Sequence, residues 1–250
     1  MQKKSVKNKE LFLRIIAVLA ALIVWELVSF IIDSPILIVG PSRVLLRLFT
    51  LIPTAVFWKS VGFTLVHIFG GYLSGLALGI LLAVLAYRIG VVKLLLMPWM
   101  ATVKSVPVAS FVVICLIWLS PANLSIFISF LIVLPICYQN TLNAMEGIDS
   151  SLTDLAELEN LSYFGRLRNI FFPNISDKLI STASLSAGIA WKAGVAAEVI
   201  GTPSGSIGRQ LYLAKTFLAT DDLLAWTVVI VLLSVGFEKL FVLVLRRLIC

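Results

Sequence analysis

The chain has 250 residues, of which 60% are hydrophobic and only 13% are charged. Its mean hydropathy of +1.06 excludes an ordinary soluble domain and predicts an integral membrane protein. The net charge of +7 could indicate nucleic-acid binding, but the basic residues are scattered at the ends of apolar segments. The membrane therefore explains the charge, and we expect no nucleic-acid partner.

Six apolar segments are long enough to cross a bilayer, which requires roughly 20 residues per helix. They lie at approximately 11–32, 60–86, 92–119, 122–144, 178–200 and 223–245. Each must be helical because lipid offers no partners to backbone polar groups, so the predicted class is all-α and polytopic. The distribution of Lys and Arg predicts that both termini are cytosolic.

The first span could belong to a signal peptide, because a basic segment precedes it. However, its apolar run is about as long as a full span and no small-residue cleavage site follows, so we expect a retained helix. The segment after it is amphipathic, with Arg43 and Arg47 on one helical face, and is predicted to lie at the outer membrane surface. We expect two units, an N-terminal part at 1–59 and a core at 60–250.

Small residues form two ridges at helical spacing. In the second span, Gly71, Gly75 and Gly79 follow one another at intervals of four and predict a close helix crossing. In the fifth span, a similar ridge of Thr182, Ser186, Ala190 and Gly194 leads to Glu198. The Glu198 carboxylate is therefore expected on a packed face.

Two lysines fall inside predicted spans, where a central Lys costs about 2.5 to 3.5 kcal/mol on insertion scales. Lys104 stands close to Pro107, which interrupts the third span, and Lys192 lies in the fifth. One interpretation is that Lys104, Lys192 and Glu198 line a translocation pathway, where the lysines would favour an anionic substrate. The other is an internal ion pair between Glu198 and one of the lysines.

The polar stretch at residues 154–173 interrupts the apolar pattern before the fifth span. Ser151 and Asp154 have the spacing of a helix start, which predicts a short helix at about 152–159. Asn160 is then expected in a turn, because Asn tolerates the left-handed conformation.

A second short helix is expected after the turn, with Ser162 as its cap and Pro173 at its end. Its apolar residues form one stripe, made of Tyr163, Phe164, Leu167, Ile170 and Phe171. Such a helix can lie in lipid headgroups, pack under the protein's own helices, or enter the groove of a partner. Ser176 is a candidate cap for the fifth span.

Catalytic and cofactor motifs are missing from the sequence. It has no GxxxxGK[ST], HExxH or GxSxG pattern, and His67 is its only histidine. The three cysteines show no metal-ligand spacing. We therefore expect no catalytic residue, no metal site and no cofactor bound by this chain.

The stretch that runs from Asp154, Ala156 and Asn160 to "IFFP" resembles the cytoplasmic EAA loop of binding-protein-dependent ABC importer permeases. Asp154 stands in place of the usual Glu and Asn160 in place of Gly. The stretches at 104–120, 134–149 and 187–201 resemble the nitrate/sulfonate/taurine branch of this family. Together they extend the resemblance over approximately residues 60–248.

The resemblance implies a type I importer fold, with an EAA-like coupling loop at 146–177, in a bacterial cell membrane. The implied partners are cytosolic ABC ATPases that bind ATP and Mg, a second permease copy, an extracytoplasmic binding protein and membrane lipid. The loop "VIGTPSGSIGRQL" would lie near the binding protein's docking site, although it also fits a plain connector. ATPase coupling would involve Asp154, Ala156, Asn160, Tyr163, Phe164, Leu167, Arg168 and Pro173.

The function implied is transport of a small solute by alternating access, driven by the partner's ATP hydrolysis, and the lysines favour an anionic solute. A stand-alone ion-coupled transporter is the main alternative, but it would favour inverted repeats, and the two halves show no self-similarity. A membrane enzyme is disfavoured because no catalytic constellation is present.

Overall fold

The computed structural model describes residues 2–149, 151–152 and 162–249. Every element in these ranges is a helix, in agreement with the predicted all-α class. The elements are α1 (Gln2–Ile32), α2 (Pro41–Leu51), α3 (Ala55–Arg88), α4 (Gly90–Ser105), α5 (Val108–Cys115), α6 (Pro121–Glu146), α8 (Tyr163–Arg166), η1 (Leu167–Phe171), α9 (Phe172–Gly201), α10 (Ile207–Thr216) and α11 (Thr220–Ile249).

Four of the described helices are each long and apolar enough to cross a membrane, namely α3, α6, α11 and the Phe12–Ile32 part of α1. The third predicted span is not one helix. It consists of α4 and α5, which are separated at Val106 and Pro107 and bent by 100°. Proline restricts the residue before it to extended conformations, and Val106 has φ −79° and ψ 131°.

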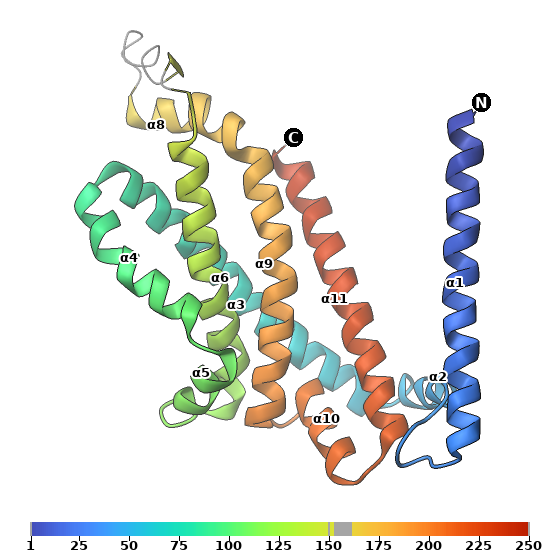
Figure 1. Cartoon of the computed structure of the whole chain (residues 1–250). Coiled ribbons are helices and arrows are strands. Elements are labelled where there is room, and N and C mark those ends of the chain that lie inside the picture. The colour runs from blue at the N-terminus through green and yellow to red at the C-terminus, as the bar shows by residue number, and fades with distance from the viewer. Residues whose placement is uncertain (1, 150, 153–161, 250) are drawn as a thin grey trace.

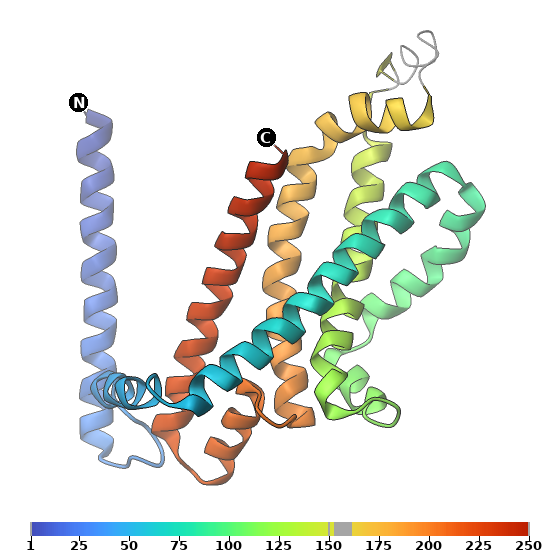
Figure 2. The same cartoon turned by 180° about the vertical axis from the view of Figure 1, so that it is seen from behind.

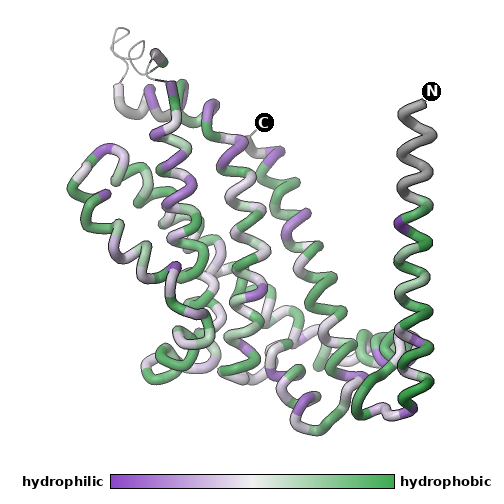
Figure 3. Tube along the Cα trace, in the orientation of Figure 1, coloured by the Kyte–Doolittle hydropathy of each residue, from purple (hydrophilic) through white to green (hydrophobic). Residues whose placement is uncertain are grey.

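The fifth predicted span corresponds to α9, which is 30 residues long but is not among these apolar helices. Figure 1 shows α9 running between α6 and α11. Its many small and polar residues include buried Thr182, Ser186 and Glu198, and Figure 3 shows it paler than α1. A helix surrounded by protein does not need an apolar surface, which explains its low hydropathy.

The glycine ridge of α3 lies against α6. A Cβ atom on Gly75 would lie 2.8 Å from the Phe130 carbonyl oxygen, and one on Gly79 would lie 2.8 Å from Cys137 Cβ. A Cβ on Gly71 would overlap the backbone of Ile126. Only residues without a side chain allow the two backbones to approach this closely.

The N-terminal helices stand apart from this core. In Figures 1 and 2, α1 is separated from the other long helices, and α2 lies across its lower end. The Glu26 carboxylate accepts hydrogen bonds from Ser42 N (3.1 Å) and Ser42 Oγ (2.6 Å), at the start of α2. Because α1 has so little contact with its own chain, its apolar side chains are almost all exposed.

Helix α2 connects this unit to the core. Arg47 binds Asp222 of α11 through two hydrogen bonds, one of them 2.9 Å from Nη2 to Oδ2. This bond raises the pKa of Arg47. Val44 is buried, whereas Leu45 and Phe49 are exposed, so only part of the predicted apolar face packs on protein.

Candidate functional site

The described part of the coupling loop starts with Ser162. The Gly165 N–H donates to Ser162 Oγ over 3.2 Å, so the predicted cap of the second short helix is confirmed. Asp154, Ala156 and Asn160 lie outside the described residues, as does most of the predicted helix at 152–159. Ser151 N donates to Asp149 Oδ1 over 2.9 Å, which lowers the pKa of Asp149.

The prediction that Pro173 ends this helix is wrong. Residues 163–201 form one uninterrupted helical run, in which the π-helical turn η1 immediately precedes α9. Proline has no N–H to donate, and in an α-helix its ring would clash with the carbonyl group four residues earlier. A π-helical turn widens the backbone at this point, and Asn174 Nδ2 donates to the Ile170 carbonyl oxygen over 2.7 Å.

Ser176 does not cap the fifth span either, because it lies inside the run and donates to the Pro173 carbonyl oxygen over 3.1 Å. Figure 1 shows the run changing direction between α8 and the descending part of α9. The coupling loop and the central helix are therefore joined by continuous helical backbone.

Two side chains of the predicted apolar stripe are described, Ile170 and Phe171, and both pack on the same cluster of the chain's own residues. Phe171 is only 6% exposed and packs against Met145 and Ile175, with its ring edge-on to Tyr87 at 5.2 Å between centroids. Of the three orientations considered for the stripe, Phe171 therefore adopts the one in which it packs under the protein's own helices. Arg168 and Pro173 are exposed, while the side chains of Tyr163, Phe164 and Leu167 lie outside the described ones.

At the other end of α9, Glu198 is fully buried. Its Oε2 atom accepts a 2.7 Å hydrogen bond from Thr64 Oγ1 of α3 and a 3.3 Å bond from the Gly208 N–H of α10. Thr64 Oγ1 in turn accepts from the Ile207 N–H over 3.0 Å. One carboxylate thus connects three helices, and we call Glu198, Thr64, Ile207 and Gly208 the Glu198 node.

No ion pair of Glu198 with a lysine occurs within the described ranges. Lys104 and Lys192 are both exposed in the single chain, and Glu198 is bound by neutral groups instead. Lys104 lies in the last turn of α4, next to the break before α5. The structure therefore does not bring these three predicted pathway residues into one cluster.

Lys192 lies on the one side of α9 that its own chain leaves uncovered. From residue 181 to the end of α9, the exposed positions are spaced by four or seven residues and so share one side of the helix. They are Ser181, Leu185, Lys192, Ala196 and Ile200. The opposite side is buried and carries Gly194, where an added Cβ would lie 2.6 Å from Ser129 Oγ and 2.8 Å from Ile68 Cδ1. Lys192 is therefore available to a solute or to another chain.

Three glycines occupy a close-packed turn between α9 and α10. Gly201 is the last residue of α9, and Gly205 has φ +84°, which favours glycine. A Cβ on Gly208 would overlap Glu198, so α10 must approach α9 here.

Sequence reasoning placed Glu198 on a packed face but missed its partners Thr64 and Gly208. Thr64 lies 134 residues away in the chain, and nothing in the local pattern marks it. Within the described ranges, no three His, Cys, Asp or Glu side chains are grouped to hold a metal.

Comparisons with known proteins agree with this architecture. Residues 75–249 match the model of the family described as binding-protein-dependent transport system inner membrane component. A Bacillus subtilis protein named for aliphatic sulfonates transport, permease protein SsuC, is 26% identical over 161 residues, which are 64% of this chain and 58% of that protein. A Methanocaldococcus jannaschii protein named as an ABC transporter permease is 23% identical over 240 residues, covering 94% of this chain and 90% of that one.

Proposed function

Because the chain belongs to the family of binding-protein-dependent transport system inner membrane components, we propose that it is the permease subunit of an ATP-driven importer. In this proposal two copies form the translocation pathway, a cytosolic ATPase supplies the energy and an extracytoplasmic binding protein delivers the solute. ATP and Mg bind to the ATPase, and this chain catalyses no reaction itself.

The observation that carries the proposal is the continuous helical run from Tyr163 to Gly201. A force applied at Tyr163 would reach α9 through continuous helical backbone. Helix α9 contacts α3, α6, α10 and α11, so its movement would reach most of the core. This is the mechanical connection that coupling to an external ATPase requires.

The positions of the chain ends support the orientation that we propose. Figure 1 places both termini at the same end of the molecule as α8, and the opposite end carries α2 and α10. With Lys and Arg enriched near the termini and the loop, that end is assigned to the cytosol. The Glu198 node then lies toward the outside, where a binding protein would dock.

Coupling is tested by alanine substitutions in the loop. Burying a Phe or Leu side chain in an ATPase groove contributes roughly 1.5 to 3 kcal/mol, whereas an exposed Arg pair contributes about 0 to 1 kcal/mol. Phe164→Ala and Leu167→Ala should therefore weaken ATPase co-purification more than Arg168→Ala. If the first two variants retain the ATPase and Arg168→Ala loses it, the docking face is assigned to the wrong side of the helix.

The substrate is proposed to be a small anion. Lys104 and Lys192 are exposed in the single chain, and the Bacillus relative is named for aliphatic sulfonates, which are anions. Lys192→Met and Lys104→Met should lower uptake of an alkanesulfonate without loss of assembly, whereas Lys239→Met on α11 is the matched control. Equal uptake in all three variants would remove both lysines from the pathway.

The rival function is ion-coupled transport by this chain alone. Proteoliposomes that contain the permease, its ATPase and its binding protein should take up solute only with ATP and with the binding protein. Uptake driven by an ion gradient in vesicles that contain the permease alone would support the rival and contradict the importer proposal.

A further inference from the structure

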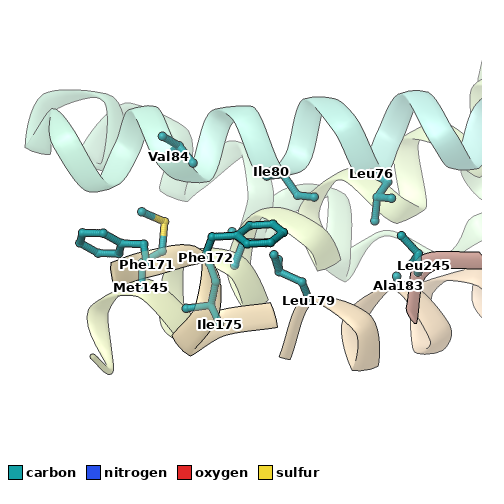
Figure 4. A pocket seen from close by; sticks show the side chains of 11 residues that line it. Leu76, Ile80, Val84, Met145, Phe171, Phe172, Ile175, Leu179, Ala183 and Leu245 are labelled. Carbon is teal, nitrogen blue, oxygen red and sulfur yellow. The ribbon is translucent and has the colours of Figure 1, made fainter. Parts of the chain in front are cut away.

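An apolar cavity lies beneath the coupling loop. It has a volume of about 270 Å³, and Figure 4 shows side chains converging on it from α3, α6, the end of η1, the start of α9 and the end of α11. Most of the lining is aliphatic or aromatic, including Ile80 and Leu76 of α3 and Leu179 of α9. Since a dry cavity of about 150 Å³ already holds a benzene-sized molecule, this one has room for a segment of hydrocarbon chain.

The cavity is unsuited to the transported solute. Thr141 is its one polar lining residue, and a small anion would find no cationic group among the lining side chains. The cavity also opens to the outside of the helix bundle. Phe172, which lines the cavity, is 45% exposed. In a membrane, this surface would face lipid.

Thr141 supplies a second, independent indication of a ligand. It is 1% exposed and lines the cavity, yet its hydroxyl has no hydrogen-bond partner among the described residues. A buried hydroxyl group without a partner is costly, so a bound group with an acceptor oxygen would stabilise it. The ester oxygens of a glycerolipid are such acceptors.

Cationic side chains are found toward the loop end of two of the lining elements. On α3, the lining positions Leu76, Ile80 and Val84 are spaced by four residues, and the next step in the series is the exposed Arg88. Arg168, also exposed, precedes the lining residue Phe172 by four positions. Arginines at the headgroup level of the cytosolic leaflet attract anionic lipids.

We propose that this cavity binds an anionic phospholipid of the cytosolic leaflet, with one acyl chain along Ile80 and Leu76 and an ester group at Thr141. The phosphate would lie near Arg88 and Arg168. The headgroup assignment rests on the cytosolic orientation proposed above, whereas acyl-chain binding does not. A lipid at this position would touch Phe171 and Phe172, where the coupling loop joins α9.

The first experiment fills the cavity and counts bound lipid. The full chain is purified in detergent, supplied with phosphatidylglycerol or phosphatidylethanolamine, and analysed by native mass spectrometry. Ile80→Trp should lower retained phosphatidylglycerol about fivefold or more, whereas Leu81→Trp, which adds the same group at the adjacent exposed position, should not. Equal retention by both variants would overturn the proposal.

The second variant tests the charge. Arg168→Gln should reduce the preference for phosphatidylglycerol over phosphatidylethanolamine about fivefold, because one surface cation near a lipid headgroup has roughly that effect. Arg43→Gln, at the opposite end of the molecule, should leave the preference unchanged. An unchanged preference in Arg168→Gln would show that this arginine does not bind the headgroup.

Photo-crosslinking of the unmodified protein decides the question if Ile80→Trp fails to fold. A phosphatidylglycerol with a diazirine in its acyl chain should label residues 76–84 and 172–183 above the level of other helices. Labelling confined to α1 and the outer face of α11 would overturn the proposal. None of these readouts requires transport, so their failure leaves the importer proposal standing, and loss of ATP-driven uptake leaves the lipid site standing.

Discussion

The contact of Gly75 with α6 gives the sharpest quantitative prediction. In Gly75→Ala, the new Cβ would lie 2.8 Å from the Phe130 carbonyl oxygen and 2.9 Å from Val133 Cβ. Favourable contacts of carbon atoms are about 3.5 to 4.0 Å, and both neighbours are held by the α6 backbone and cannot rotate away. The two helices must therefore separate or slide.

Gly70→Ala provides the matched control, because its Cβ would meet nothing within 4 Å. Both substitutions gain the same helix propensity of alanine over glycine, so the difference between them isolates the packing term. That term is about 1 to 3 kcal/mol for overpacking a close contact, which corresponds to roughly a 5- to 150-fold change in the unfolding equilibrium.

The assay is reversible unfolding of the purified chain in mixed micelles, followed by the loss of helical circular dichroism as denaturing detergent increases. We expect Gly70→Ala to be as stable as the parent protein or more stable, and Gly75→Ala to be less stable than Gly70→Ala by the stated amount. Equal stability of the two variants would refute the inference that α3 and α6 require glycine at this crossing.

Three further predictions concern individual side-chain contacts. Phe171→Ala should lower the free energy of unfolding by about 3 to 5 kcal/mol, measured in the same assay. Phe172→Ala should lower it by less, because Phe172 is 45% exposed. Glu198→Gln preserves the acceptor for Thr64 and should destabilise the protein less than Glu198→Ala. The alanine variant leaves the buried donors unpaired, at about 1 to 3 kcal/mol each. The reverse order would contradict the hydrogen bonds assigned to the Glu198 node. Arg47→Ala should lower stability by no more than about 1 kcal/mol, because the bond to Asp222 is partly exposed, and high salt should abolish most of the difference.

The general architecture could be predicted from the sequence because it follows from local patterns. Apolar runs marked the crossing helices, and the spacing of Gly71, Gly75 and Gly79 identified a face of α3 that proves to lie on α6. These signals depend on helix periodicity and on the absence of side chains, both of which are visible within a few turns of sequence.

The remaining features depend on tertiary context. Pro173 is normally a helix terminator, but the π-helical turn before it lets the helix continue. Phe171 belonged to an amphipathic stripe whose partner no pattern could identify, and that partner is Met145 and Tyr87 of the same chain. Thr64 and Glu198 are brought together only by the packing of α3 on α9.

The Glu198 node also limits how the half of the molecule that carries α10 can deform. Helices α3, α9 and α10 meet at the Glu198 carboxylate. If any one of them slid alone, this buried carboxylate or a buried N–H donor would lose its hydrogen-bond partner. The displacement with the lowest free-energy cost moves all three helices together as a rigid block. Opening at this end of the molecule would then change mainly the contacts between that block and the remaining helices. The bent junction of α4 with α5 is one position where the chain could move.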